Sequence, residues 1–179
     1  MSTYDTIQFP GQNGVAVELR SMLPEDAAAL RALLSHPELR RHIVMRREGS
    51  QSDSMDKLMS RMLHAYDPCA LHAGIYRGGT DELIGTVSFQ CWNRRNGTAI
   101  LGYMLDPAWW GRGLATEAVG LMLYYGIKEL GITQVEGRCK GDNIGSERVM
   151  IKNGMRLVRI IPVAGSLSDV IKVFRLLHK

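Results

Sequence analysis

Residues 101–118 have the sequence LGYMLDPAWWGRGLATEA, and this stretch changes character twice. It begins as an apolar segment typical of a strand, turns at Asp106-Pro107, and enters a helical segment after Gly111-Arg112-Gly113. Glycines let backbone N–H groups approach a ligand closely, and the first turn of a helix presents unpaired N–H groups at the positive end of its dipole. The stretch therefore predicts a strand, a phosphate-binding loop and a helix, with Arg112 as an added positive charge.

Two widespread phosphate-binding patterns are absent from this stretch. GxGxxG would require a third glycine where Thr116 stands, and GxxxxGK[ST] is missing altogether. On the residues alone, two interpretations stay open. The loop binds phosphate, or it is a tight turn whose glycines serve steric needs.

The segments on either side of the loop predict an α/β fold. Strands are expected at 15–22, 69–77, 82–92, 98–105, 133–140, 155–163 and 169–177, and helices at 24–35, 54–64, 114–130 and 143–152. Turn-forming residues at 78–81 and 93–97 predict an antiparallel meander. The helix after the glycine loop would connect the fourth and fifth strands as parallel neighbours. We therefore expect a mixed, mostly antiparallel sheet of about seven strands with four to five helices.

The composition is that of an ordinary globular protein. The chain has 179 residues, 45% hydrophobic and 22% charged, which suits one domain over 1–179 with a core over about 15–177. No apolar run reaches the ~18–20 residues of a membrane span, so no membrane association is expected. Residues 1–5 lack the features of a signal peptide, so we expect a cytoplasmic protein.

The charge suits a polyanionic ligand. The net charge is +4 and the pI is about 9.1, and a phosphorylated cofactor suffices to explain both. The densest basic group, Arg40, Arg41, Arg46 and Arg47, fits a solvated helix face better than a nucleic-acid site. The three cysteines are expected to be buried and inert within strands, and no metal site is expected because no Cys/His cluster has zinc spacing.

The glycine loop resembles the acetyl-CoA loop of the GCN5-related N-acetyltransferase (GNAT) superfamily, whose pattern is Gln/Arg-x-x-Gly-x-Gly/Ala. Gly113 and Ala115 occupy the last two fixed positions. Trp110 occupies the first, a departure common in the branch that resembles the ribosomal-protein N-terminal acetyltransferases (RimJ/RimL-like). Further similar pieces occur in order at Leu19-Arg20 with Asp26, and at 101–103, 142–146 and 152–155. The resemblance covers about residues 15–177.

This resemblance implies an N-acetyltransferase that moves an acetyl group directly from acetyl-CoA to a primary amine, without a covalent enzyme intermediate or a metal. The acceptor would be a protein N-terminus or a small molecule, and it would enter between splayed fourth and fifth strands. A homodimer is also implied. The cofactor-binding residues would be Tyr103, Met104 and Leu105 for the pantetheine arm, and Gly111, Arg112, Gly113, Leu114, Ala115 and Thr116 for the pyrophosphate.

Two polar side chains downstream carry the expected chemistry. Asn143 and Ser146 are three residues apart and therefore lie on one face of a helix start. The resemblance implies that Asn143 contacts the pantetheine or nearby main chain and that Ser146 donates a proton to the CoA thiolate. Ordinary helix capping is the alternative interpretation, and for Asn143 the two roles are compatible.

The general base is the least defined part of the predicted site. Many relatives have a glutamate just before the Leu-Gly-Tyr stretch, whereas this chain has Ile100, which cannot accept a proton. Glu136 is a weak substitute candidate, with a surface or strand-pair charge as the alternative. A water relay or the selection of an already neutral amine would also remove the proton.

Several alternatives stay open at this level. The same fold would serve as a non-catalytic acyl-CoA-binding sensor, or as a ribosome- or RNA-associated module that uses the Arg40–Arg47 region. Tyr103, Trp109 and Trp110 would line the cleft or else form core or dimer contacts. Glu117 is expected to complement the dipole at a helix start. The sequence leaves open the acceptor and the length of the acyl group.

Overall fold

The computed structural model describes residues 16–43, 55–63, 67, 69–166 and 168–178. Its strands are β1 (Val17–Arg20), β2 (Leu71–Arg77), β3 (Leu83–Asn93), β4 (Thr98–Leu105), β5 (Gln134–Lys140), β6 (Arg156–Pro162) and β7 (Val170–Leu177). Its helices are the 3-10 turns η1 (Pro24–Asp26) and η2 (Pro107–Trp109) and the α-helices α1 (Ala27–Ser35), α2 (Pro37–His42), α3 (Met55–Leu63), α4 (Leu114–Lys128) and α5 (Ile144–Lys152).

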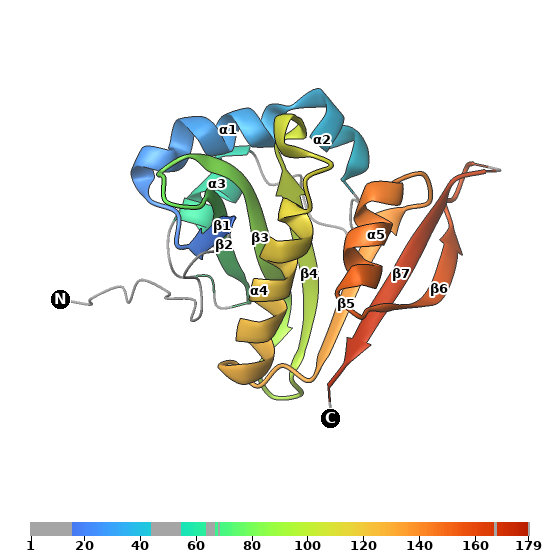
Figure 1. Cartoon of the computed structure of the whole chain (residues 1–179). Helices are drawn as coiled ribbons and strands as arrows, with labels where there is room; N and C mark the ends of the chain where they lie inside the picture. Colours follow the sequence, from blue (N-terminus) through green and yellow to red (C-terminus); the bar gives the residue numbers. More distant parts are fainter. Residues whose placement is uncertain (1–15, 44–54, 64–66, 68, 167, 179) are drawn as a thin grey trace.

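All seven strands belong to one sheet in the order β1-β2-β3-β4-β5-β7-β6 (Figure 1). Every neighbouring pair is antiparallel except β4 and β5, which are parallel and joined through α4. This confirms the predicted α/β fold, the meander and the single parallel connection.

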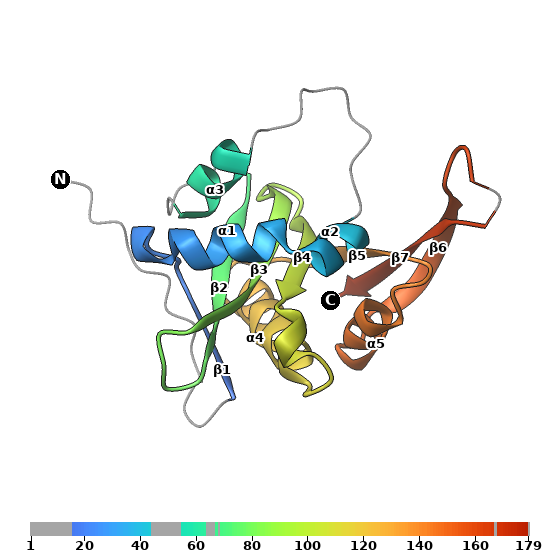
Figure 2. The same cartoon turned by 90° about the horizontal axis from the view of Figure 1, so that it is seen from above.

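Helices cover both faces of the sheet (Figure 2). On one face, α4 buries Ala118, Val119 and Met122 in the larger core cluster with side chains of β1 to β5. On the other face, α1, α2 and α3 form a second cluster that includes Leu30 and Met62. Burial of these apolar side chains stabilises both faces at roughly 25 cal/mol per Å².

The two parallel strands diverge halfway along their length. Pairing between β4 and β5 runs only from Thr98↔Gln134 to Leu101↔Gly137. Two backbone hydrogen bonds hold the closed end, because the N–H groups of Thr133 and Gln134 both donate to the Gly97 carbonyl. Beyond Leu101 the two strands have no mutual pairing, which confirms the splay that the resemblance implied.

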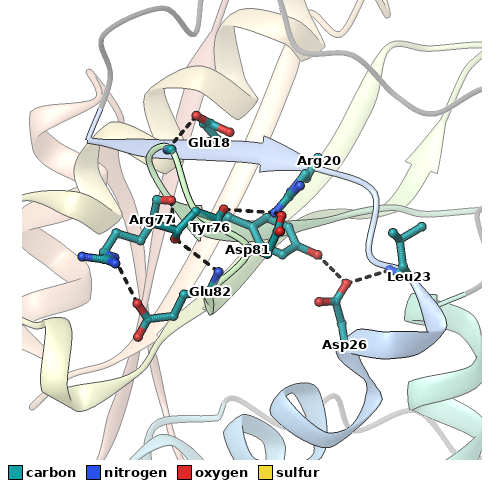
Figure 3. A network of polar contacts seen from close by, with 10 residues as sticks. Glu18, Arg20, Leu23, Asp26, Tyr76, Arg77, Asp81 and Glu82 are labelled. Atoms are coloured by element: carbon teal, nitrogen blue, oxygen red, sulfur yellow. Dashed lines mark hydrogen bonds and ion pairs between the residues drawn. The ribbon is translucent and has the colours of Figure 1, made fainter.

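A polar network fixes the first helical segment against the sheet (Figure 3). Asp26 Oδ2 accepts hydrogen bonds from Tyr76 Oη at 2.6 Å and from Leu23 N at 2.7 Å. The Arg20 guanidinium lies 3.9 Å above the Tyr76 ring and pairs with Asp81 at 2.7 Å. These contacts give a structural reason for the Arg20 and Asp26 positions of the motif, because they orient the chain that enters α1.

Glu117 has an additional structural role that the sequence did not predict. It lies in the first turn of α4, as expected, but its Oε1 also accepts hydrogen bonds from Ala16 N at 2.8 Å and Val17 N at 3.4 Å. The carboxylate therefore ties the beginning of β1 to the helix that follows the glycine loop.

The prediction that all three cysteines are buried in strands is wrong for two of them. Cys69 precedes β2 and is exposed. Cys91 lies in β3 but is exposed at an irregularity of the ladder, where its φ is +48°. Only Cys139 is buried, and burial raises the pKa of its thiol to about 11.

No helix in the described ranges is both long and apolar enough to cross a membrane. Within the same ranges, no group of three or more His, Cys, Asp and Glu side chains is arranged to hold a metal ion.

Candidate active site

A cleft of about 740 Å³ opens where β4 and β5 separate. This volume is within the ~300–1,000 Å³ typical of small-molecule sites. Its walls are residues 100–105 of β4, the glycine loop with the start of α4, the start of α5, and the end of α2. The cleft therefore joins the predicted phosphate loop to the predicted catalytic side chains.

The glycine loop has the backbone shape that an anion site requires. Gly111 and Gly113 have φ values of +75° and +79°, a region that residues with a side chain rarely adopt. Gly113 is the N-cap residue of α4. No side chain caps this end, and the first hydrogen bond runs from Glu117 N to Gly113 O. The three N–H groups before it, those of Leu114, Ala115 and Thr116, have no intrahelical acceptor and can bind phosphate oxygens.

The aromatic residues beside the loop have separate contacts. Trp110 Nε1 donates to the Leu105 carbonyl at 2.6 Å, which ties the loop to the end of β4 and occupies that carbonyl. The Arg112 guanidinium lies 4.9 Å from the centre of the Trp109 ring, and Arg112 is not among the residues that line the cleft. Of the predicted cofactor-binding residues, Arg112 alone lies outside the cleft wall.

The cleft is also lined by two cations of α5 that were not predicted from the sequence. Arg148 and Lys152 are four residues apart on the helix, so they lie on one face. Neighbouring Asn153 holds this helix to α4, because its Nδ2 donates to the Thr116 carbonyl at 3.1 Å. Their i, i+4 spacing on a helix that faces the phosphate loop is the sequence signal by which the two cations could have been found.

Tyr103, Asn143 and Ser146 meet in the cleft. Asn143 caps α5, because its Oδ1 accepts from Ser146 N at 3.0 Å. Ser146 Oγ lies 2.7 Å from Tyr103 Oη, which is also 2.9 Å from the Ser146 carbonyl. Burial raises the pKa of Tyr103 well above its usual 10.0, while the hydrogen bond to Ser146 acts in the opposite direction. The phenol therefore stays protonated at neutral pH and can donate to Ser146.

Glu136 lies directly beside Ile100 in the parallel register of β4 and β5. Its Oε1 accepts from Arg138 Nε at 2.9 Å and Nη2 at 2.8 Å, and its Oε2 accepts from Arg175 Nη2 at 3.4 Å. Partial burial raises the pKa of this carboxyl, but the two arginines outweigh that effect and leave the pKa below its ordinary 4.5. A carboxylate held in this way is a poor proton acceptor.

We predict that Glu136→Gln lowers the free energy of unfolding by about 1–3 kcal/mol at pH 7, because two arginines lose a charged partner. A depressed pKa in the folded state stabilises the fold above pH 4.5, and this contribution is lost as pH falls through the folded value. Urea unfolding of both proteins should therefore show a difference that narrows below pH 4.5. A difference that is constant down to pH 3 contradicts the proposed role of the charge.

The rest of the cleft wall is formed by side chains that lie far apart in the sequence. Leu39, His42 and Ile43 come from α2 and its end, while Gln90 and Arg138 come from β3 and β5. Lys140 Nζ donates to the carbonyl of Arg41, which holds the end of α2 beside β5. Arg46 and Arg47 of the predicted basic group lie outside the described residues.

Comparisons with known proteins agree with this geometry. The family model described as "Acetyltransferase (GNAT) domain" matches residues 16–156. The chain is 28% identical to the uncharacterized N-acetyltransferase YoaA of Bacillus subtilis (strain 168), over 77% of this chain and 78% of that protein. It is 32% identical to the ribosomal-protein-serine acetyltransferase of Escherichia coli (strain K12), over 50% of each chain.

A solved structure shares the fold at lower identity. The spermidine N-acetyltransferase of Vibrio cholerae, crystallised with CoA and spermine, superposes with a TM-score of 0.76. Its sequence identity is 16%, and the superposition covers 91% of this chain and 96% of that one.

Proposed function

Because this chain belongs to the GNAT family of acetyltransferases, we propose that it transfers an acetyl group from acetyl-CoA directly to a primary amine in the cleft between β4 and β5. One observation carries the proposal. The cleft connects the uncapped start of α4 to the Tyr103–Ser146 pair along the unpaired edge of β4.

The chain offers matching groups for the pyrophosphate and the pantetheine arm of the cofactor. The pyrophosphate would accept hydrogen bonds from the N–H groups at the start of α4, and Arg148 and Lys152 would add positive charge. The pantetheine arm would lie along Gly102–Leu105, where β4 has no pairing with β5. Arg112, whose guanidinium stacks on Trp109, would act from the outer surface of the loop.

The transfer step follows from these positions. The amine nitrogen attacks the thioester carbon, a C–N bond forms, and the carbonyl oxygen gains negative charge that a backbone N–H of β4 would stabilise. The C–S bond then breaks, and the sulfur leaves as a thiolate. Ser146 would donate its proton to this sulfur and would regain one from Tyr103 or water. The proton of the attacking amine goes to water.

The state of Glu136 favours an acceptor that needs little help to lose its proton. An α-amine has a pKa near 8, about two units below a lysine amine, so a useful fraction is neutral at physiological pH. We therefore propose a terminal α-amine as the acceptor and water as the proton carrier. Glu136 would act as a structural partner of Arg138 and Arg175 rather than as the base.

A non-catalytic acyl-CoA sensor is the second candidate, and the isoleucine at position 100 favours it. The decisive experiment is release of CoA thiol from acetyl-CoA in the presence of a panel of N-terminal peptides, polyamines and amino acids. Turnover with at least one α-amine is the expected result. Tight acetyl-CoA binding by calorimetry without turnover on any amine would support the sensor instead.

A further inference from the structure

We infer that the acceptor is a polypeptide N-terminus followed by acidic residues, which bind to the arginine-bearing face of β5, β7 and β6. The inference rests on the proposed acetyl transfer. In this arrangement the reacting amine lies in the cleft, where β4 and β5 separate. The following residues of the peptide lie outside the cleft, on the sheet.

Strand pairing brings a set of arginines onto one face of the sheet. Directly opposed residues of neighbouring strands project from the same face. One row across β5, β7 and β6 is Glu136, Arg175 and Arg156, and the next row is Arg138, Val173 and Arg159. Lys140 follows on β5 with the same alternation. We call Arg138, Lys140, Arg156, Arg159 and Arg175 the basic face.

The basic face is not neutralised by the described part of the chain. Glu136 is the one carboxylate in its rows, and Arg138 and Arg175 share it. Arg156 and Arg159 are exposed and have no ion pair or side-chain hydrogen bond to another described residue. The buried Nε of Arg175 also has no acceptor there. Arg156 and Arg159 therefore have unused capacity to bind an anion.

Elsewhere on the surface, three arginines have their own carboxylate partners. Arg20 pairs with Asp81 at 2.7 Å, Arg31 with Asp56 at 2.8 Å, and Arg77 with Glu82 at 3.0 Å.

On the basic face, by contrast, Arg156 lies directly opposite Arg175. Like charges at directly opposed positions destabilise a sheet. An acidic ligand would remove this repulsion. An ordinary solvated surface would not need such a ligand.

The basic face is continuous with the cleft. Arg138 is one of the residues that line the cleft. Strands are roughly 4.8 Å apart, so β6 lies about 10 Å beyond β5. An extended peptide advances about 3.3–3.6 Å per residue, so acidic side chains at positions two to five would reach these arginines. The carboxylate of a free amino acid is too close to its own amine to do so.

The β6 edge of the basic face is the part open to this ligand, because Val173 at the centre of the face is fully buried and Lys140 on β5 contacts the end of α2. In Figure 2, α5 lies on one side of β6 and β7, and no labelled helix covers their other side. The pairing of Lys172 with Glu147 of α5 places that helix on the face opposite the basic face, because Lys172 and Val173 alternate along β7.

The same charges disfavour a polyamine. With Arg148 and Lys152 engaged by the pyrophosphate, Arg138 is the cation of the cleft wall that joins the basic face, and Asp142 is the one carboxylate of the wall among the described residues. A polycation such as spermine would meet charges of its own sign, and opposed like charges oppose binding. This chain is therefore expected to differ in acceptor from the spermidine N-acetyltransferase whose fold it shares.

The test uses two eight-residue peptides that begin with serine and differ only at positions two to five, which are Asp/Glu in one and Asn/Gln in the other. With acetyl-CoA at low salt, kcat/KM should be about 10-fold higher for the acidic peptide, equivalent to about 1.4 kcal/mol. The preference should come from KM and should shrink as salt is added. Equal use of both peptides, or better use of spermidine than of either, overturns the inference.

Variants locate the effect on the basic face. Arg156→Gln combined with Arg159→Gln should raise KM for the acidic peptide until the preference is about 2-fold, because two exposed charges are lost and kcat does not depend on them. The KM for the neutral peptide should be affected less than the KM for the acidic one. Arg95→Gln, at an exposed turn position between β3 and β4, is the control and should keep the full preference.

Two further outcomes separate this inference from its premise. If acetyl-CoA binds but neither peptide nor any other amine is acetylated, both the proposed function and the inference fail. If both peptides are acetylated equally and the double variant instead loses salt-dependent binding of RNA, the transferase stands. The basic face is then a nucleic-acid surface, and the inference is wrong.

Discussion

Gly113→Val should weaken acetyl-CoA binding by at least ~100-fold, equivalent to about 2.7 kcal/mol, while the protein stays folded. Gly113 has φ +79°, which a β-branched residue adopts only with strain of about 1–3 kcal/mol. A loop that relaxes this strain moves the N–H groups at the start of α4 away from the phosphate positions. Isothermal titration calorimetry with CoA measures the affinity, and circular dichroism checks the fold.

Gly131→Val is the matched control for this prediction. Gly131 also has a positive φ of +66° and, like Gly113, open space where a Cβ would project, but it lies at the other end of α4. The control should lose a similar amount of stability and keep its affinity for CoA. Equal loss of binding in both variants would show that general destabilisation is responsible. Tight binding by Gly113→Val would place the phosphate site elsewhere.

The features that could be predicted from the sequence are those with local signals. β4 begins at Thr98 and ends at Leu105 as predicted, because turn residues and the glycine loop flank an apolar segment. α4 begins at Leu114 for the same reason, directly after a glycine with positive φ. The parallel connection follows from the length of this crossover, and the sheet order confirms it.

The features that could not be predicted depend on contacts between distant segments. The end of α2 reaches the cleft because Lys140 holds the carbonyl of Arg41, a pairing that leaves no pattern in either segment. Glu136 was a base candidate on sequence position. The strand register shows that Glu136 does lie beside Ile100, but its carboxylate is engaged in ion pairs with two arginines on separate strands. Cys91 is exposed because the ladder of β3 is irregular there, which periodicity does not reveal.

Ser146→Ala should lower kcat by about 10- to 100-fold and should change the KM for acetyl-CoA by less than about 3-fold. General acids typically contribute 10²–10⁴-fold, and the lower range applies because a thiol with a pKa near 8.5 is already a fair leaving group. The Ser146 hydroxyl is the group that would act, since its N–H is occupied by Asn143. Thiol release measured from pH 6 to pH 9 tests this, and an unchanged kcat over that range contradicts the proton-donor role.

Tyr103→Phe separates proton donation by Ser146 from simple packing. The phenol stays protonated up to pH 9 because burial raises its pKa, so it can orient the serine hydroxyl throughout the range. We expect the single variant to lose about 2- to 10-fold in kcat, and the double variant with Ser146→Ala to be no slower than Ser146→Ala alone. Independent, multiplicative losses would mean that Tyr103 acts on the substrate directly and that the two hydroxyls do not form one relay.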